Sequence, residues 1–204
     1  MTFTTAARLG LVLTAAAAAP MVALAPAPEG TGATADDLVR EARSSGLEGW
    51  ELVDRANDLV HGAYDHYSAW HLWESPATSL AHGRGSSVQV NRVLAQVLTA
   101  LGFEVELVHA ARVRFGRHPW WHAGHLWARV TIAGEQRDVC AMTEGNRAGR
   151  VAFTPLTEVR EVHPWTIPAV TAGLAPFVVV QVWRQLVLGD EVPGWMYRPF
   201  GELA

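Results

Sequence analysis

The sequence predicts an α+β fold in which a buried amphipathic helix packs on an antiparallel sheet. Two observations support this prediction. Segment 87–102 carries apolar residues at helical spacing, and the three segments that follow, 103–115, 125–132 and 137–141, have the alternation or composition of strands. A helix followed by sequential strands with short connections is typical of an antiparallel meander packed on that helix.

The helix predicted for 87–102 has one wide apolar stripe, because its large aliphatic side chains recur at spacings of three and four. These residues are Val90, Val93, Leu94, Val97, Leu98 and Leu101. A stripe of this width is typical of a helix that is buried against a sheet. Gly102 is expected to end the helix. Ser86 and Ser87 lie at its N-terminus.

Two helices are expected before this one. Thr34 is followed by acidic residues, which is typical of an N-cap and a first helical turn. Ser45 precedes Glu48 by three residues, the spacing of a capping box, so a second helix is expected to begin there and to reach about Gly62. Segment 64–85 has no clean period and is interpreted as a structured loop.

The last part of the chain is strongly apolar over 165–183, although Pro168 and Pro176 interrupt it. A helix that closes over the core is expected here. A membrane span is disfavoured because the apolar stretch has marginal length and ends at Arg184. The remaining tail is expected to form an ordered strap.

The length of 204 residues suggests one domain, assigned to 34–204 with an apolar C-terminal extension. Residues 1–33 differ from the rest, because Arg8 precedes an apolar run over 9–25. Such a segment resembles a signal peptide. An apolar helix or a disordered arm explains the same residues, so both cytoplasmic and exported locations stay open.

Composition excludes several classes of function. The net charge is −4, the chain contains no Lys, and its Arg residues are scattered, so no nucleic-acid partner is expected. Cys140 is the only cysteine, which excludes an intramolecular disulfide and a Cys-based zinc site.

Three residues suggest catalytic chemistry. Ser87 lies at a predicted helix N-terminus, where the positive end of the helix dipole favours a nucleophile and an oxyanion. His125 opens one predicted strand and Asp138 lies on the next. If these two are cross-strand neighbours, the carboxylate would orient the imidazole as in a nucleophile–His–Asp arrangement.

A family resemblance adds to this pattern. The run Gly-Arg-Gly-Ser-Ser-Val-Gln-Val-Asn (83–91), followed by a helix and Leu-Gly-Phe-Glu-Val, resembles the nucleophile helix of transglutaminase-like (papain-like) proteins and that of arylamine N-acetyltransferases. Gly-His-Leu-Trp (124–127) is similar to the family's His strand, and Arg-Asp-Val (137–139) to the strand that follows it. The resemblance implies a transglutaminase-like fold in which Ser87 replaces the nucleophilic Cys, with His125 and Asp138 as its partners.

A serine at this place leads to two hypotheses. A thiol beside a histidine can ionise, whereas a hydroxyl must lose its proton during attack and needs tighter geometry. The first hypothesis is a Ser87–His125–Asp138 site that acts on amide or ester bonds of a peptide or small acyl substrate without a cofactor. The second is a catalytically inactive module that binds a peptide or small molecule. Its cleft would be lined by aromatic residues, namely Trp70, Trp73, Trp120 and Trp121.

Two further possibilities concern other residues. His118, His122 and His125 lie close together, and zinc accepts such ligands, but their spacing matches no strong metal motif, so no metal is assigned. Cys140 lies two residues after Asp138 and would share its side of a strand. It is either a relocated nucleophile or a small buried core thiol, and the second interpretation is favoured.

Overall fold

The computed structural model describes residues 12, 15–115 and 122–201, with the backbone only at 122 and 123. Helices and strands alternate irregularly along the chain. In order they are α2 (Ala35–Ser44), α3 (Gly49–Gly62), β1 (His66–Ser68), α4 (Pro76–Ala81), β2 (Arg84–Gly85), α5 (Ser87–Ala100), β3 (Glu104–Phe115), β4 (His122–Ile132), β5 (Glu135–Val139), β6 (Phe153–Pro155), β7 (Arg160–Glu161), α6 (Thr166–Leu188) and β8 (Tyr197–Pro199).

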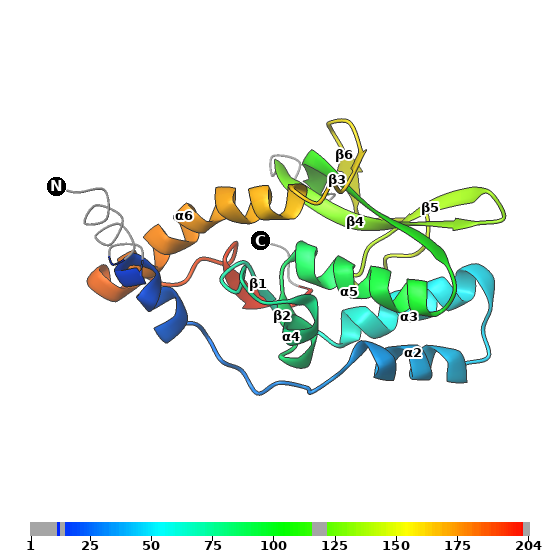
Figure 1. The fold of residues 1–204 in the computed structure, drawn as a ribbon, viewed down its shortest axis with the longest axis horizontal. Coiled ribbons are helices and arrows are strands. Elements are labelled where there is room, and N and C mark those ends of the chain that lie inside the picture. The colour runs from blue at the N-terminus through cyan, green and yellow to red at the C-terminus, as the bar shows by residue number, and fades with distance from the viewer. Residues whose placement is uncertain (1–11, 13–14, 116–121, 202–204) are drawn as a thin grey trace.

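Helix α5 packs on the larger of two sheets, as Figure 1 shows. The strand order of this sheet is β5-β4-β3-β6, all of its pairs are antiparallel, and β7 also pairs with β3. A smaller sheet, β2-β1-β8, brings the C-terminal segment beside the N-terminal end of α5. The predicted α+β fold, with a buried helix on an antiparallel sheet, is confirmed.

The main core forms where α5 meets the sheet. Its buried side chains from α5 are those of the predicted stripe: Val90, Val93, Leu94, Val97 and Leu98. Ala128 and Val130 of β4 join this core, whereas Trp127, which precedes Ala128, joins a second buried cluster with Val108 and Phe153. Successive residues of a strand face opposite sides of the sheet, so β4 contributes to both clusters.

Helix ends follow the sequence signals in part. Gly102 adopts a φ of +100° directly after the C-cap of α5, as a stop signal requires. Thr34 caps α2 in a capping box with Asp37. The prediction of a capping box at Ser45 is wrong. Ser45 instead ends α2 by donating to the carbonyl of Ala42, and α3 begins four residues later.

Segment 64–85 is more ordered than a loop, because β1, α4 and β2 lie within it. The buried Arg84 guanidinium forms an ion pair with Glu74, with 2.6 Å between Nη2 and Oε1, and donates to the carbonyl of Pro26. Gly85 approaches the next layer closely, since a Cβ there would collide with the Ser79 hydroxyl oxygen. These contacts fix the chain just before α5 begins.

Asn91 joins α5 to both neighbouring strands. Its Nδ2 donates to the carbonyl oxygen of Leu126 at 2.8 Å, and its Oδ1 accepts from the backbone N–H of Ala141 at 3.1 Å. The same Nδ2 lies 3.6 Å from the Cys140 sulfur. Asn91 is fully buried, so the amide meets the hydrogen-bonding needs of its own polar atoms through these contacts.

Helix α6 was expected to close over the core, but only Val178 and Val182 of its residues are buried. Within the described residues it is the helix that is long and apolar enough to cross a membrane, judged by length and composition alone. Residues 15–23 are helical and contact its C-terminal half, where the Trp183 Nε1 donates to the Ala17 carbonyl at 3.0 Å.

Replacement of Asn91 by Ala is expected to lower the free energy of unfolding by about 2–4 kcal/mol, because buried backbone groups on β4 and after β5 lose their partner. Urea denaturation measures this difference. Gln96→Ala is the matched control, since Gln96 is an exposed residue of the same helix. Equal stabilities for the two variants would show that the amide does not hold the helix to the sheet.

Candidate functional site

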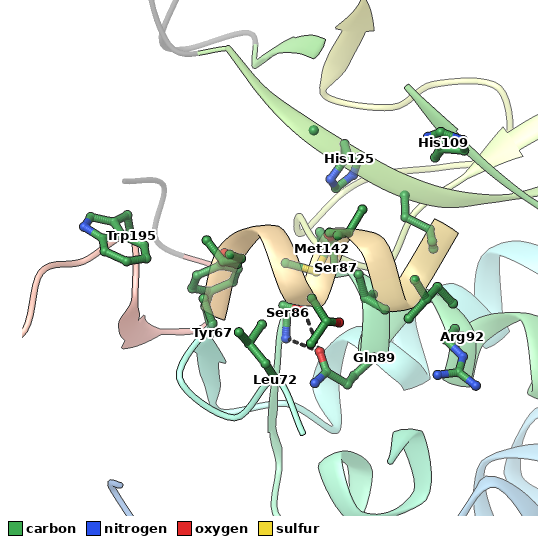
Figure 2. A pocket seen from close by; sticks show the side chains of 18 of the residues that line it. Tyr67, Leu72, Ser86, Ser87, Gln89, Arg92, His109, His125, Met142 and Trp195 are labelled. Atoms are coloured by element: carbon green, nitrogen blue, oxygen red, sulfur yellow. Dashed lines mark hydrogen bonds between the residues drawn. The ribbon is translucent and has the colours of Figure 1, made fainter. Parts of the chain in front are cut away.

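A cavity of about 680 Å³ lies at the N-terminal end of α5. Its walls come from α5, β3, β4, α6 and the C-terminal segment around β8. Ser87 and His125 both line it, as Figure 2 shows, so the structure brings two of the three predicted site residues to one space.

Ser87 is the first residue of α5 and is half-buried. The helix is capped by its neighbour, because Ser86 and Gln89 form a capping box in which the Ser86 backbone N–H donates to Gln89 Oε1 at 3.0 Å. The Ser87 hydroxyl is therefore not used as a cap. Within the described part of the chain, no hydrogen bond joins Ser87 to His125.

His125 lies in an aromatic environment and is only 7% exposed. Its ring is edge-on to Phe115 and Phe153, with centroid distances of 5.4 and 4.7 Å, and is stacked on Trp127 at 6.0 Å. Burial lowers the pKa of His125 to about 4, because the surrounding rings do not solvate a charged imidazolium. The ring is therefore neutral at pH 7.

The position of Asp138 requires a correction. Asp138 faces Arg129 across β4 and β5, and its Oδ1 lies 2.8 Å from the Arg129 Nε. Beside His125 stands Cys140, whose sulfur is 3.4 Å from Nε2. The two-residue offset arises because Asp138 pairs with residue 129 of β4, so the chain reaches His125 only after β5 has ended.

Cys140 is a buried thiol, as the favoured interpretation of the sequence expected. It is 1% exposed and belongs to the second core cluster. Burial raises its pKa to about 11, so the sulfur stays protonated at neutral pH. A neutral thiol can form a weak hydrogen bond with the His125 ring, but it places no negative charge beside the ring.

The aromatic residues of the cavity differ from those predicted. Trp70 is fully buried in a third cluster, and its Nε1 donates to the Met21 carbonyl at 2.8 Å. Trp73 is 47% exposed and tilts against His71, away from the lining of the cavity. Trp120 and Trp121 lie outside the described residues. The aromatic residues that line the cavity are Tyr67, Phe115, Phe177, Trp195 and Phe200.

Sequence reasoning missed the contribution of α6 and the C-terminal segment to the cavity. The only signal was the apolar, aromatic composition of 165–204, which was interpreted as core cover and strap. β8 does act as a strap, because it pairs with β1 and so brings Trp195 and Phe200 to the cavity. Their position depends on this pairing, which no local pattern reveals.

Two cations line the cavity. Arg92 projects from the second turn of α5, and Arg198 stacks over Tyr67 with its guanidinium carbon 4.1 Å from the ring centre. Glu74 is the acidic residue of the lining, and Arg84 neutralises it. The space is therefore largely apolar, and Arg92 brings a positive charge to it.

The described residues contain no group of three or more His, Cys, Asp or Glu that could hold a metal ion. His118 lies outside them, and the side chain of His122 is not described. His109 lines the cavity with His125, from the neighbouring strand.

Comparison with known proteins gives structural matches alone. No protein-family model matches the sequence, and no curated protein matches it. Several solved structures are similar, including the following three. One is a TGase, with a TM-score of 0.43 and 12% identity over 58% of this chain and 33% of the TGase. A second is a proposed cysteine protease from Cytophaga hutchinsonii, with a TM-score of 0.41 and 12% identity over 63% of this chain and 49% of that protein. The third is a proposed protease from Parabacteroides distasonis, with a TM-score of 0.34 and 16% identity over 71% of this chain and 29% of that protein. This chain therefore spans less than half the length of each.

The low pKa of His125 has a consequence for stability. Between pH 6.5 and about 4 the unfolded chain binds a proton at this residue that the folded chain does not, so stability falls as pH falls through this window. His125→Gln is expected to reduce the loss of unfolding free energy between pH 7 and pH 5 by about 1–2 kcal/mol.

Urea denaturation at the two pH values measures this effect. His163→Gln serves as the control, because His163 is exposed in a loop. The explanation is wrong if the His125 variant, like the His163 variant, loses as much unfolding free energy between pH 7 and pH 5 as the parent does. An NMR titration in which His125 protonates near pH 6.5 would also contradict it.

Proposed function

We propose that this chain is a transglutaminase-like domain that binds a ligand in the cavity over Ser87 and His125 and no longer supports acyl transfer. The observation that carries this proposal is the neutral thiol of Cys140 at the Nε2 of His125. A serine nucleophile needs a base that can take its proton and a negative charge that stabilises the resulting imidazolium. The thiol provides no such charge.

The environment of His125 supports the same conclusion. A base is most efficient when its pKa lies near the working pH, and burial holds the pKa of this imidazole near 4. Transfer of the Ser87 proton to such a ring is unfavourable. The carboxylate that could raise the pKa, Asp138, is engaged with Arg129 instead.

The lining of the cavity indicates the class of ligand. Aliphatic and aromatic side chains from five elements form most of its wall, and Arg92 adds positive charge. Apolar cavities with few polar groups bind apolar ligands and orient them through those groups. A ligand with an apolar body and an acidic head group, such as a carboxylate, fits this description.

A second candidate function is a Ser87–His125 hydrolase of ester or amide bonds. The observation in its favour is that the Ser87 hydroxyl faces the same cavity as His125 and is not used to cap α5. The helix dipole at this end of α5 favours an oxyanion. The two candidates differ in whether Ser87 is activated.

Labelling with a serine-directed fluorophosphonate distinguishes them. The parent is expected to label no faster than Ser87→Ala, because His125 does not activate the hydroxyl. Labelling of the parent that disappears in Ser87→Ala and in His125→Gln would instead establish the hydrolase. Ser87→Cys in a Cys140→Ser background, tested with iodoacetamide, shows whether a thiol at this place is activated by the same ring.

Binding of a dansylated undecanoate probe tests the ligand class. Fluorescence enhancement is expected with the parent, and Arg92→Gln is expected to weaken binding about tenfold, in line with the loss of a charge-assisted contact. Arg40→Gln is the control, because Arg40 is an exposed residue of α2 far along the chain from the cavity lining. No enhancement with the parent, or equal affinities for both variants, would exclude an acidic amphiphile held by Arg92.

A further inference from the structure

The outer face of α6 is apolar and open to solvent. The helix has 23 residues, and Val178 and Val182 are its buried members. Among the others, Val180 is 59%, Val187 68% and Leu188 67% exposed. A helix that is apolar on all sides is normally enclosed by protein or lipid, and a contiguous apolar patch of this extent marks an interaction surface.

The charges and aromatic residues along α6 indicate the partner. No Asp, Glu, Lys or Arg occurs from Thr166 to Trp183. Arg184 then forms an ion pair with Asp190, at 2.7 Å between Nε and Oδ2. Trp165, 80% exposed, precedes the helix, and Trp183 lies near its other end. Tryptophan at the ends of a charge-free apolar segment is typical of contact with the interface of a bilayer.

A second apolar segment lies beside this face. Residues 15–23 are helical, and Trp183 donates to the Ala17 carbonyl. Met21 packs with Val178 and Val182 of α6, whereas Val22 on the same segment is 69% exposed. Figure 1 shows this segment in blue beside the end of α6 in orange. The two helices together therefore extend one apolar surface.

We propose that α6, together with residues 15–23, binds a lipid bilayer as an interfacial element that lies on the membrane. The inner face of α6 is occupied, because Val178 and Val182 pack with Trp70 and Met196. Residues of its first half line the cavity. A helix that crossed the bilayer would lose these contacts, whereas a helix lying in the interface keeps them and buries its outer face in lipid.

The sequence alone disfavoured a membrane partner, because the marginal length of the apolar stretch and Arg184 at its end argued against a span. The exposed outer face favours membrane contact without a span, since an interfacial helix needs no particular length. The inference does not depend on the proposed function, because the outer face lies outside the Ser87–His125 site. If it is correct, the wall of the cavity that α6 forms would lie next to the membrane.

Flotation of the full chain with extruded phosphatidylcholine vesicles tests the proposal. The parent is expected to float at low and at high salt, because apolar burial and not the net charge of −4 drives binding. The triple variant Val180→Gln, Val187→Gln, Leu188→Gln is expected to reduce the floating fraction about tenfold or more, since it removes the apolar contact with lipid.

Leu47→Gln with Leu156→Gln is the matched control, because these residues are exposed and apolar but lie outside α6. This control is expected to float as the parent does, and thermal unfolding should show that all variants are equally folded. A parent that stays in solution, or a triple variant that floats equally well, would overturn the proposal. So would a parent that is dimeric by light scattering, does not float, and becomes monomeric in the triple variant, because a second copy would then cover the face.

Discussion

The side chain of Asn91 is the contact on which the site depends. One buried amide satisfies the Leu126 carbonyl of β4 and the Ala141 N–H that follows β5, and it reaches the Cys140 sulfur. It thereby fixes the position of α5 relative to both strands. Ser87, one turn before Asn91 on the same helix, and His125, next to Leu126 on β4, owe their shared cavity to this connection.

The chemistry of the site is decided by what stands behind His125. Cys140 sits in a core cluster with Trp127 and Phe153, where its thiol remains protonated and the imidazole remains neutral. This arrangement is stable as a packed core, because neither group brings an uncompensated charge into it. The burial that keeps the imidazole neutral also lowers its pKa to about 4, which makes it a weaker base for a serine hydroxyl. If Ser87 were a nucleophile, the packing around His125 would therefore oppose its catalysis.

Helix α6 links the cavity to the surface. Its first half lines the cavity and its buried residues pack on Trp70 and Met196, while its outer face carries apolar side chains into solvent. The cavity is thus closed on one side by an element that has its own unsatisfied apolar surface. A partner that covers the outer face would also fix the wall of the cavity, so the proposed ligand binding and surface binding would be physically connected.

The sequence by itself determined part of the local structure. The stripe of α5, its stop at Gly102, the Thr34 cap and the alternation of the strands follow from side-chain spacing and backbone preferences, which act over a few residues. Tertiary structure alone decided that Asp138 pairs with Arg129, that Cys140 meets His125, and that α6 and Trp195 line the cavity. Strand register and the packing of distant segments set these contacts, and neither can be recognised from a periodic pattern in the sequence.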